Sequence, residues 1–474
     1  MSENYSHILK YTGIFGGVQG ISILVGIVRT KLVAVLLGTE GVGLASLFNS
    51  TIKLVGDSTN LGLSVSAVRE ISDAYEKNDA ERLNHSIKLI RSWSLLTALL
   101  GMLVCLAASP LLNKWTFTWG DHTLHFVLLS PVVALLAITG GEMAVLKGTR
   151  RLRALAEISI YNVVASLLVT VPLYYFWREA AIVPVLFLVA LVQMLLTIGY
   201  SYRFHPLHVS LSKLLLREGL GMVWLGVAFV LAGIMGSGAD LVIRAYLNTA
   251  DSLDAVGLYS AGYVMTMTYA GMVFSAMDQD YFPRLSGVVK NMIDRTVILT
   301  KQLDVTLMII TPMLVAFIVV MPIIVPLLLS GEFSSIIPMA QIIAASLIFR
   351  AIYLPNAYLP LAAGDSKVYF ALNLIGALNT FWIILGYELG GLIGMGVAMF
   401  GENLIDVLMV MFISKWKYKI SLPSKTKSMI IFGFLLMFVT YSLCYLLEGW
   451  SYWAVGVILI AVSIWYSLKN YKEA

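Results

Sequence analysis

The sequence predicts an all-α protein that crosses a membrane many times. Of its 474 residues, 59% are apolar and only 12% are Asp, Glu, Lys or Arg, about half the charged share of an ordinary soluble domain. Long apolar runs recur along the whole chain, which indicates membrane-spanning helices rather than the short alternating strands of an outer-membrane barrel. A water-soluble domain is therefore excluded as the main part of the fold.

We predict fourteen transmembrane helices. The first begins after a short polar segment and has no small-residue cleavage site, so it is expected to be retained rather than removed as a signal peptide. The predicted spans are residues 11–38, 42–66, 90–112, 123–147, 155–177, 181–202, 219–248, 255–279, 303–330, 336–362, 368–387, 389–414, 428–447 and 450–468. Several exceed 25 residues, as tilted or kinked helices do. No intervening loop is long enough to fold as a domain.

The distribution of Lys and Arg predicts the orientation of these helices. With the N-terminus inside, 25 of the 32 Lys and Arg residues fall in cytoplasmic segments, and two, Lys114 and Arg178, fall in external ones. This asymmetry follows the positive-inside rule, so both termini are predicted to be cytoplasmic. The net charge of +5 is scattered between apolar runs, and no nucleic-acid partner is expected.

An internal repeat predicts two lobes. Residues 28–32 (VRTKL) match 243–247 (IRAYL) at an offset of 215, and residues 42–46 (VGLAS) match 256–260 (VGLYS) at 214. The offset contains six predicted helices, an even number, so both halves would insert in the same orientation. We therefore predict two pseudo-symmetric six-helix lobes, residues 1–203 and 204–416, around a central cavity, with residues 417–474 as an appended helix pair.

Ionisable side chains within the spans are the candidate substrate-binding residues, because each costs at least ~2.5 kcal/mol at the bilayer centre. Arg29 and Arg244 occupy matching repeat positions, which would place them on opposite walls of the cavity. Guanidinium groups suit a diphosphate; alternatively, both arginines reach toward the outer interface. Lys31 is a further candidate, but it lies about 200° around the helix from Arg29, so the two cannot both face the cavity squarely.

Two i,i+4 pairs add further charges within the spans. Lys53 with Asp57, and Asp240 with Arg244, either neutralise each other or take part in substrate binding. Asp57, Asp240 and Lys53 are therefore included among the substrate-binding candidates.

A second group of ionisable residues lies near the C-terminal end of the repeat. Glu402 and Asp406 carry like charge four residues apart within one span. They form either a proton or sodium coupling site or, with Arg350, a structural ion network. Glu142 is expected at the inner membrane interface.

The sequence contains no enzyme motif and no metal site that we can identify. His122 and His125 are three residues apart, but no cysteine or carboxylate set accompanies them, so we expect interfacial residues rather than metal ligands. Cys105 and Cys444 lie in separate apolar runs and are expected to be buried and inert. Apart from a coupling proton or sodium ion, no cofactor is expected.

Several motifs resemble those of a known family. Residues 29–44 (RTKLVAVLLGTEGVGL) resemble the first-helix signature of the Wzx-type polysaccharide flippases, or O-antigen translocases. Similarity continues at residues 254–258 (DAVGL), 282–286 (FPRLS) and 327–333 (LLLSGEF), and it covers about residues 8–416. These flippases belong to the multidrug/oligosaccharidyl-lipid/polysaccharide (MOP) exporter superfamily, with drug exporters and peptidoglycan-precursor flippases.

The resemblance implies a function. A member of this family would move undecaprenyl-diphosphate-linked oligosaccharide from the cytoplasmic to the outer leaflet of the bacterial inner membrane by alternating access. It would serve O-antigen (lipopolysaccharide), capsule or related polysaccharide synthesis, as a monomer among membrane lipids, beside a polysaccharide polymerase and a chain-length regulator. Arg29 matches an arginine important in the peptidoglycan-precursor branch. The second-helix arginines of that branch have no match, since Lys53 and Asp57 stand there, which argues against a peptidoglycan precursor as substrate.

Two alternatives remain open. A cation-coupled drug or metabolite exporter of the same superfamily would depend on acidic residues such as Asp57, Glu402 and Asp406. A membrane polysaccharide polymerase would need a sizeable external loop with catalytic acids or arginines, and the sequence offers none. A flippase is therefore favoured over both the exporter and the enzyme.

Overall fold

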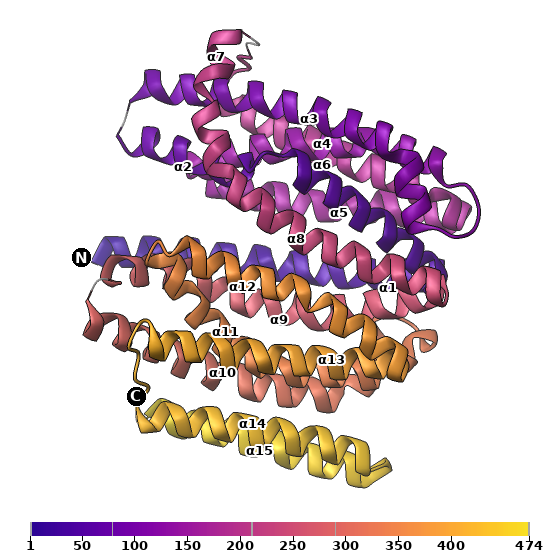
Figure 1. Cartoon of the computed structure of the whole chain (residues 1–474), viewed down its shortest axis with the longest axis vertical. Coiled ribbons are helices and arrows are strands. Elements are labelled where there is room, and N and C mark those ends of the chain that lie inside the picture. The colour runs from indigo at the N-terminus through magenta and orange to yellow at the C-terminus, as the bar shows by residue number, and fades with distance from the viewer. Residues whose placement is uncertain (1, 78, 210–211, 290, 473–474) are drawn as a thin grey trace. The chain divides into compact units, whose positions relative to one another are not determined.

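The chain is helical wherever its fold is described. The computed structural model describes the backbone of residues 2–77, 79–209, 212–289 and 291–472, and these ranges contain α-helices and short 3-10 helices but no strand. Figure 1 shows the long helices side by side. The all-α prediction is confirmed.

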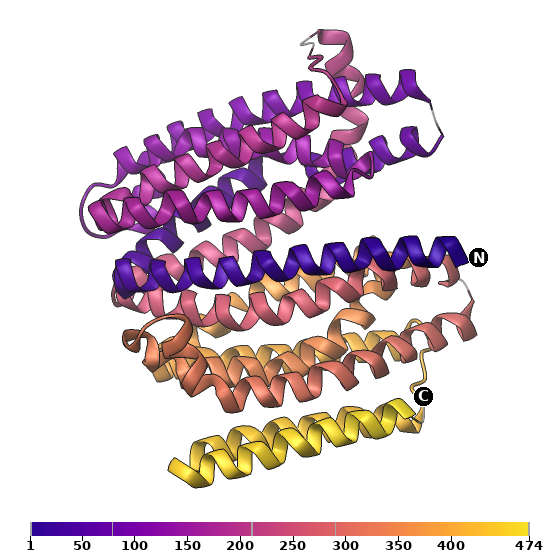
Figure 2. The same cartoon turned by 180° about the vertical axis from the view of Figure 1, so that it is seen from behind.

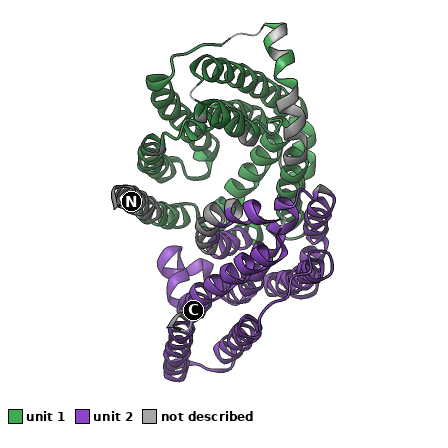
Figure 3. Cartoon of the chain, turned by 90° about the vertical axis from the view of Figure 1, so that its left-hand side faces the viewer, with its two compact units in different colours: residues 1–257 green, residues 258–474 purple. Residues whose placement is uncertain are grey.

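The chain divides into two compact units, Met1–Gly257 and Leu258–Ala474, coloured separately in Figure 3. The first unit contains α1 (Ser2–Thr59), α2 (Leu63–Glu76), α3 (Ala80–Thr116), α4 (Thr123–Gly148), α5 (Leu152–Trp177), the 3-10 helix η1 (Arg178–Ala181), α6 (Ile182–Phe204), α7 (Lys213–Glu218) and α8 (Leu220–Ala250). The second contains most of α9 (Leu253–Val288), then α10 (Met292–Leu328), η2 (Gly331–Ile336), α11 (Ile337–Ala362), α12 (Ser366–Leu378), α13 (Thr380–Trp416), α14 (Ser424–Leu446) and α15 (Gly449–Lys472). The lobes predicted from the repeat stay a prediction.

Ten stretches of the described chain are long and apolar enough to cross a membrane, which confirms a multi-pass membrane protein. Three of them contain a break: Leu24–Thr59 at Gly38, Arg153–Phe204 at η1, and Lys367–Trp416 at Gly390 and Gly391. Each break lies within three residues of a predicted boundary between two spans. Gly38 has a φ of 67°, a left-handed conformation that favours glycine over residues with a side chain. The count of fourteen spans stays a prediction.

Close helix packing in the first unit depends on small residues. A Cβ atom at Gly141 of α4 would collide with Ser94 of α3, and one at Gly148 would collide with Ile71 of α2. Apolar helices gain little from the hydrophobic effect inside a bilayer, so close van der Waals contact of this kind supplies much of their association.

A buried ion pair also joins α3, α4 and α6. Arg91 Nε donates to Glu142 Oε1 over 2.9 Å, and a second guanidinium nitrogen donates to Oε2 over 3.1 Å. Ser201 Oγ donates to the same carboxylate, and Arg91 also donates to the carbonyl oxygens of His205 and Pro206. Glu142 is only 3% exposed, so it is buried within the protein, and its place at the inner membrane interface stays a prediction. Because α3 begins at Ala80, ten residues before the predicted span, Arg91 lies well inside a helix that packs on α4.

The second unit is built on α10, α11 and α13, with the α14–α15 hairpin packed on its α10 side. Figures 1 and 2 show this hairpin in yellow. Tyr452 of α15 donates its hydroxyl to the Val319 carbonyl over 2.7 Å, and a Cβ at Gly456 would collide with the Val319 side chain. The last two helices are therefore an integral part of this unit.

The two matched repeat segments meet within the first unit. A Cβ at Gly43 of α1 would collide with the carbonyl oxygen of Leu253, and one at Gly257 would collide with that of Thr39. The Thr39 hydroxyl donates to the Asp254 carboxylate. The glycines therefore let α1 and the first turns of α9 cross with their backbones in contact.

This crossing predicts that Gly43→Ala destabilises the protein, by about 1–3 kcal/mol as in other overpacked sites, because the helices must separate to admit the methyl group. Gly56→Ala is the matched control, since it lies on the same helix with nothing within 4 Å of the added Cβ. Thermal unfolding of the purified protein in detergent measures both. Equal midpoints for the two variants would contradict the crossing.

Candidate functional site

The predicted substrate-binding residues all lie on α1 and α8, which pack together in the first unit. Arg244 of α8 forms an ion pair with Asp240, one turn earlier, and its Nε donates to Ser46 Oγ of α1 over 2.6 Å. Ser50 of α1 donates to Asp240 Oδ2 over 2.8 Å. Two serines one turn apart on α1 thus hold a charge pair on α8.

This arrangement neutralises Arg244 internally. Its side chain is 6% exposed, against 24% for that of Asp240. Ser46 and Ser50 were missed by the sequence reasoning, although their spacing of four residues places both on one face of a predicted helix. The structure thus realises one of the two alternatives for the pair, neutralisation, and leaves a substrate role for Arg244 as a prediction.

The other charges on α1 are arranged differently. Asp57 faces α8, with its carboxyl carbon 3.6 Å from the Cβ position of Gly233. Lys53 is exposed, and in the part of the chain that the structure describes it forms no ion pair with Asp57 or another acid. The expected Lys53–Asp57 pair is therefore not formed, and only the acidic member faces the neighbouring helix.

Arg29 differs from Arg244 in having no acidic partner among the described residues. It is half-buried on α1, near the buried Tyr174 of α5, and no carboxylate among the described residues forms an ion pair with it. Lys31, two residues further on, is also half-buried. A role for Arg29 in binding an anion stays a prediction.

The predicted ion-coupling residues lie together in the second unit. Glu402 and Asp406 lie about one turn apart on α13. Asn379, at the junction of α12 and α13, donates to Asp406 Oδ1 over 3.4 Å. Asn379 also lies within hydrogen-bonding reach of Glu402. Glu402 Oε2 is buried and has no hydrogen-bond partner in the described chain.

Arg350 of α11 does not close this group into an ion network. Its side chain is exposed, its NH1 group contacts Met267 Sδ at 3.9 Å, and among the described residues it forms no ion pair with Glu402 or Asp406. The two carboxylates provide oxygen atoms, the ligands that a hard cation prefers, and Asn379 directs its N–H group toward them. Asn379 was missed, and its position at a helix junction was the available signal.

His122 and His125 of the first unit belong to an aromatic cluster. The His122 ring lies 5.1 Å from that of His125 and 4.1 Å from that of Phe117, and His125 stacks on Phe48 of α1. Neither ring nitrogen of His122 has a hydrogen-bond partner in the described chain. The described residues include no group of three His, Cys, Asp or Glu side chains placed to hold a metal ion.

This cluster predicts a loss of stability on acidification. Burial, and secondarily the neighbouring His125, lowers the pKa of His122 below its usual 6.5, against a smaller opposing effect of Asp121. As the pH falls below 6.5, the unfolded chain gains its proton first, so stability decreases until the pH passes the lower pKa of the folded state. His122→Phe should reduce this dependence between pH 7.5 and pH 5.

Thermal unfolding at a series of pH values tests this expectation. His208→Phe is the control, because His208 is exposed beyond the end of α6. Some dependence will remain from His205, whose pKa burial also lowers. An unchanged pH profile in His122→Phe would show that the imidazole is protonated equally in both states.

These features describe a multi-pass helical membrane protein with ionisable groups inside its candidate spans. The fold is that of the MOP superfamily. The chain superposes on the lipid II flippase MurJ in an inward closed conformation with a TM-score of 0.71 and 14% identity, covering 97% of this chain and 98% of MurJ. An inward-facing multidrug resistance MATE family transporter superposes with a TM-score of 0.68 and 14% identity, covering 84% of this chain and 94% of the transporter. A MOP superfamily transporter from Pyrococcus furiosus superposes with a TM-score of 0.60 and 12% identity, covering 86% of this chain and 93% of the transporter.

The sequence identifies the family more closely. The sequence model of a protein family described as polysaccharide biosynthesis protein matches residues 8–289, more than half of the chain. The protein therefore belongs to this family of polysaccharide biosynthesis proteins, and the resemblance to Wzx-type flippases of the MOP superfamily is confirmed. No curated protein sequence matches the chain. The family and the structural relatives are transporters and flippases, not enzymes.

Proposed function

We propose that the protein is a flippase that moves undecaprenyl-diphosphate-linked oligosaccharide from the cytoplasmic to the outer leaflet of a bacterial inner membrane. The observation that carries the proposal is Arg29, a membrane-embedded arginine with no acidic partner among the described residues. The family match and the likeness to a lipid II flippase support it. The product would enter O-antigen, capsule or related polysaccharide synthesis, beside a polymerase and chain-length regulator.

The charge pattern of α1 and α8 favours an anionic substrate. A guanidinium group in a span is costly unless a partner or water compensates it, and a diphosphate can accept two parallel hydrogen bonds from arginine. Arg244 is already neutralised by Asp240. We therefore assign diphosphate binding to Arg29, with Lys31 and Lys53 as auxiliary cations, and assign to Arg244 the joining of α1 and α8.

The α14–α15 hairpin supports a flippase over a drug exporter. The MurJ structure covers 97% of this chain, whereas the MATE structure covers 84%. The difference is about the length of residues 417–474, the predicted appended pair. A long polyprenyl chain needs an extended apolar surface, and the hairpin adds exposed side chains such as Leu435, Phe438 and Trp465.

Leaflet exchange in vesicles tests the assignment of Arg29. Purified protein is reconstituted with fluorescent undecaprenyl-diphosphate oligosaccharide, and the rate at which the label becomes accessible outside is followed. Arg29→Ala should slow exchange about 10- to 100-fold, since a charged hydrogen bond contributes about 1.5–3 kcal/mol, and Arg29→Lys should restore part of it. Arg153→Ala is the control, because that side chain is 86% exposed.

The outcomes separate the alternatives. A wild type no faster than empty vesicles, for several glycans, would overturn the flippase in favour of an exporter that depends on Asp57, Glu402 and Asp406. Normal exchange in Arg29→Ala would overturn the assignment of the diphosphate to Arg29. A larger loss in Arg244→Ala with an unchanged unfolding midpoint would move the binding role to Arg244.

We further propose that Glu402 and Asp406, with Asn379, take up the ion that drives transport, either a proton or sodium. In vesicles with an imposed gradient of either ion, wild-type exchange should accelerate, and Glu402→Gln or Asp406→Asn should remove the acceleration but keep the rate without a gradient. Glu388→Gln is the control on the same helix, since Glu388 is exposed. Acceleration retained in both variants would refute this coupling site.

A further inference from the structure

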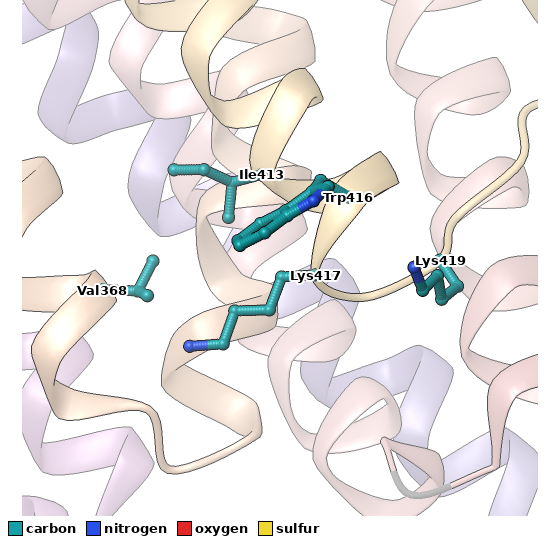
Figure 4. A pocket seen from close by; sticks show the side chains of 5 residues that line it. All are labelled: Val368, Ile413, Trp416, Lys417 and Lys419. Carbon is teal, nitrogen blue, oxygen red and sulfur yellow. The ribbon is translucent and has the colours of Figure 1, made fainter.

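The second unit carries a pocket at one end of α13. Its volume is about 480 Å³, within the range of small-molecule sites. Val368 of α12 and Ile413 and Trp416 of α13 line it, together with Lys417 and Lys419 of the segment that follows α13. Figure 4 shows the Trp416 indole between Ile413 and Lys417, with Val368 across from them and Lys419 on the turn.

The pocket lies at the boundary between the membrane and water. The apolar stretch Lys367–Trp416 ends at its mouth, and Trp416 is 67% exposed, with its ring parallel to that of Phe412. Tryptophan is enriched at this depth because its ring is apolar and its N–H group is polar. The pocket thus opens where a lipid headgroup would meet its acyl chains.

The surroundings of the pocket are strongly basic. Residues 415–427 contain five lysines and no acidic residue, and this segment belongs to the side that the positive-inside rule places in the cytoplasm. The nearby Asp365 carboxylate already has partners, because it forms an ion pair with Lys417 and accepts a hydrogen bond from the Tyr418 hydroxyl over 3.0 Å. Lys419 forms no ion pair with any described residue.

We propose that this pocket binds an anionic glycerophospholipid of the cytoplasmic leaflet. Lys419, assisted by Lys417, binds the phosphate, and an acyl chain lies on Ile413 and Trp416 toward Val368. The headgroup is selected by charge, because a zwitterionic lipid offers the two lysines no net negative charge. The bound lipid bridges α12 and α13, the helices that carry Asn379, Glu402 and Asp406. The site is separate from the proposed transport function and does not depend on it.

Native mass spectrometry of the full chain in detergent tests the site, with phosphatidylglycerol and phosphatidylcholine as probes. The wild type should retain one phosphatidylglycerol more tightly than phosphatidylcholine. Lys419→Gln should weaken the binding of phosphatidylglycerol about fivefold, the effect of one lysine near an anionic surface. The double variant Lys417→Gln/Lys419→Gln should weaken this binding further. Trp416→Ala should weaken both lipids.

The double variant Lys415→Gln/Lys427→Gln is the matched control. It removes the same charge from the same segment, but neither residue lines the pocket, so binding should stay at the wild-type level. Because Lys417 also pairs with Asp365, Lys417→Arg keeps that ion pair and should bind normally.

Three results would overturn the proposal. They are equal weakening in the control and pocket variants, equal affinity for the two phospholipids, and tighter retention of undecaprenyl diphosphate than of phosphatidylglycerol. The last would make the pocket an entry site for a transported lipid. Lys419 forms no ion pair with any described residue, so the variant Lys419→Gln breaks no such contact. This single variant therefore tests lipid binding even where the double variant fails to fold.

Discussion

The cost of placing charge in a medium without water governs this structure. A charged side chain in the hydrocarbon region must find a partner, a water-filled cavity or a route to the interface. Arg91 with Glu142 and Arg244 with Asp240 satisfy this constraint through ion pairs supported by serine hydroxyls. Arg29, without an acidic partner, does not satisfy it through the described protein alone. That exception is the basis of the role proposed for Arg29.

Breaks in the helices place these charges. Gly38 lets α1 change direction, and Gly390 with Gly391 does the same within α13, where Gly386 and Gly394 then pack backbone to backbone. The junction of α12 and α13 brings Asn379 to the two carboxylates of α13. Glycine is required at Gly38 and Gly391 because their φ angles are positive, and at Gly386 and Gly394 because a side chain would meet a neighbouring backbone. Local backbone freedom therefore determines which polar groups meet.

Much of the fold could be predicted from the sequence, because composition and apolar length decide membrane insertion almost independently of tertiary contacts. The positions of the three breaks could be predicted to within three residues for the same reason. What could not be predicted is how each helix is rotated against its neighbours. Rotation decides that Asp57 faces α8 whereas Lys53 does not, and that Glu142 meets Arg91. Ser46 and Asn379 were missed because their roles exist only once a partner helix lies beside them.

The unequal states of the two matched arginines have a consequence for recognition. A diphosphate that approached Arg244 would also meet the Asp240 carboxylate, and repulsion between like charges would offset much of the attraction. The buried phenol of Tyr174 beside Arg29 carries no charge at neutral pH, so no such repulsion arises there. Sequence symmetry between the arginines thus coexists with electrostatic asymmetry. Under the proposed function, an anion would therefore be held mainly from the Arg29 side, which would leave the Asp240–Arg244 contact free to hold α8 against α1.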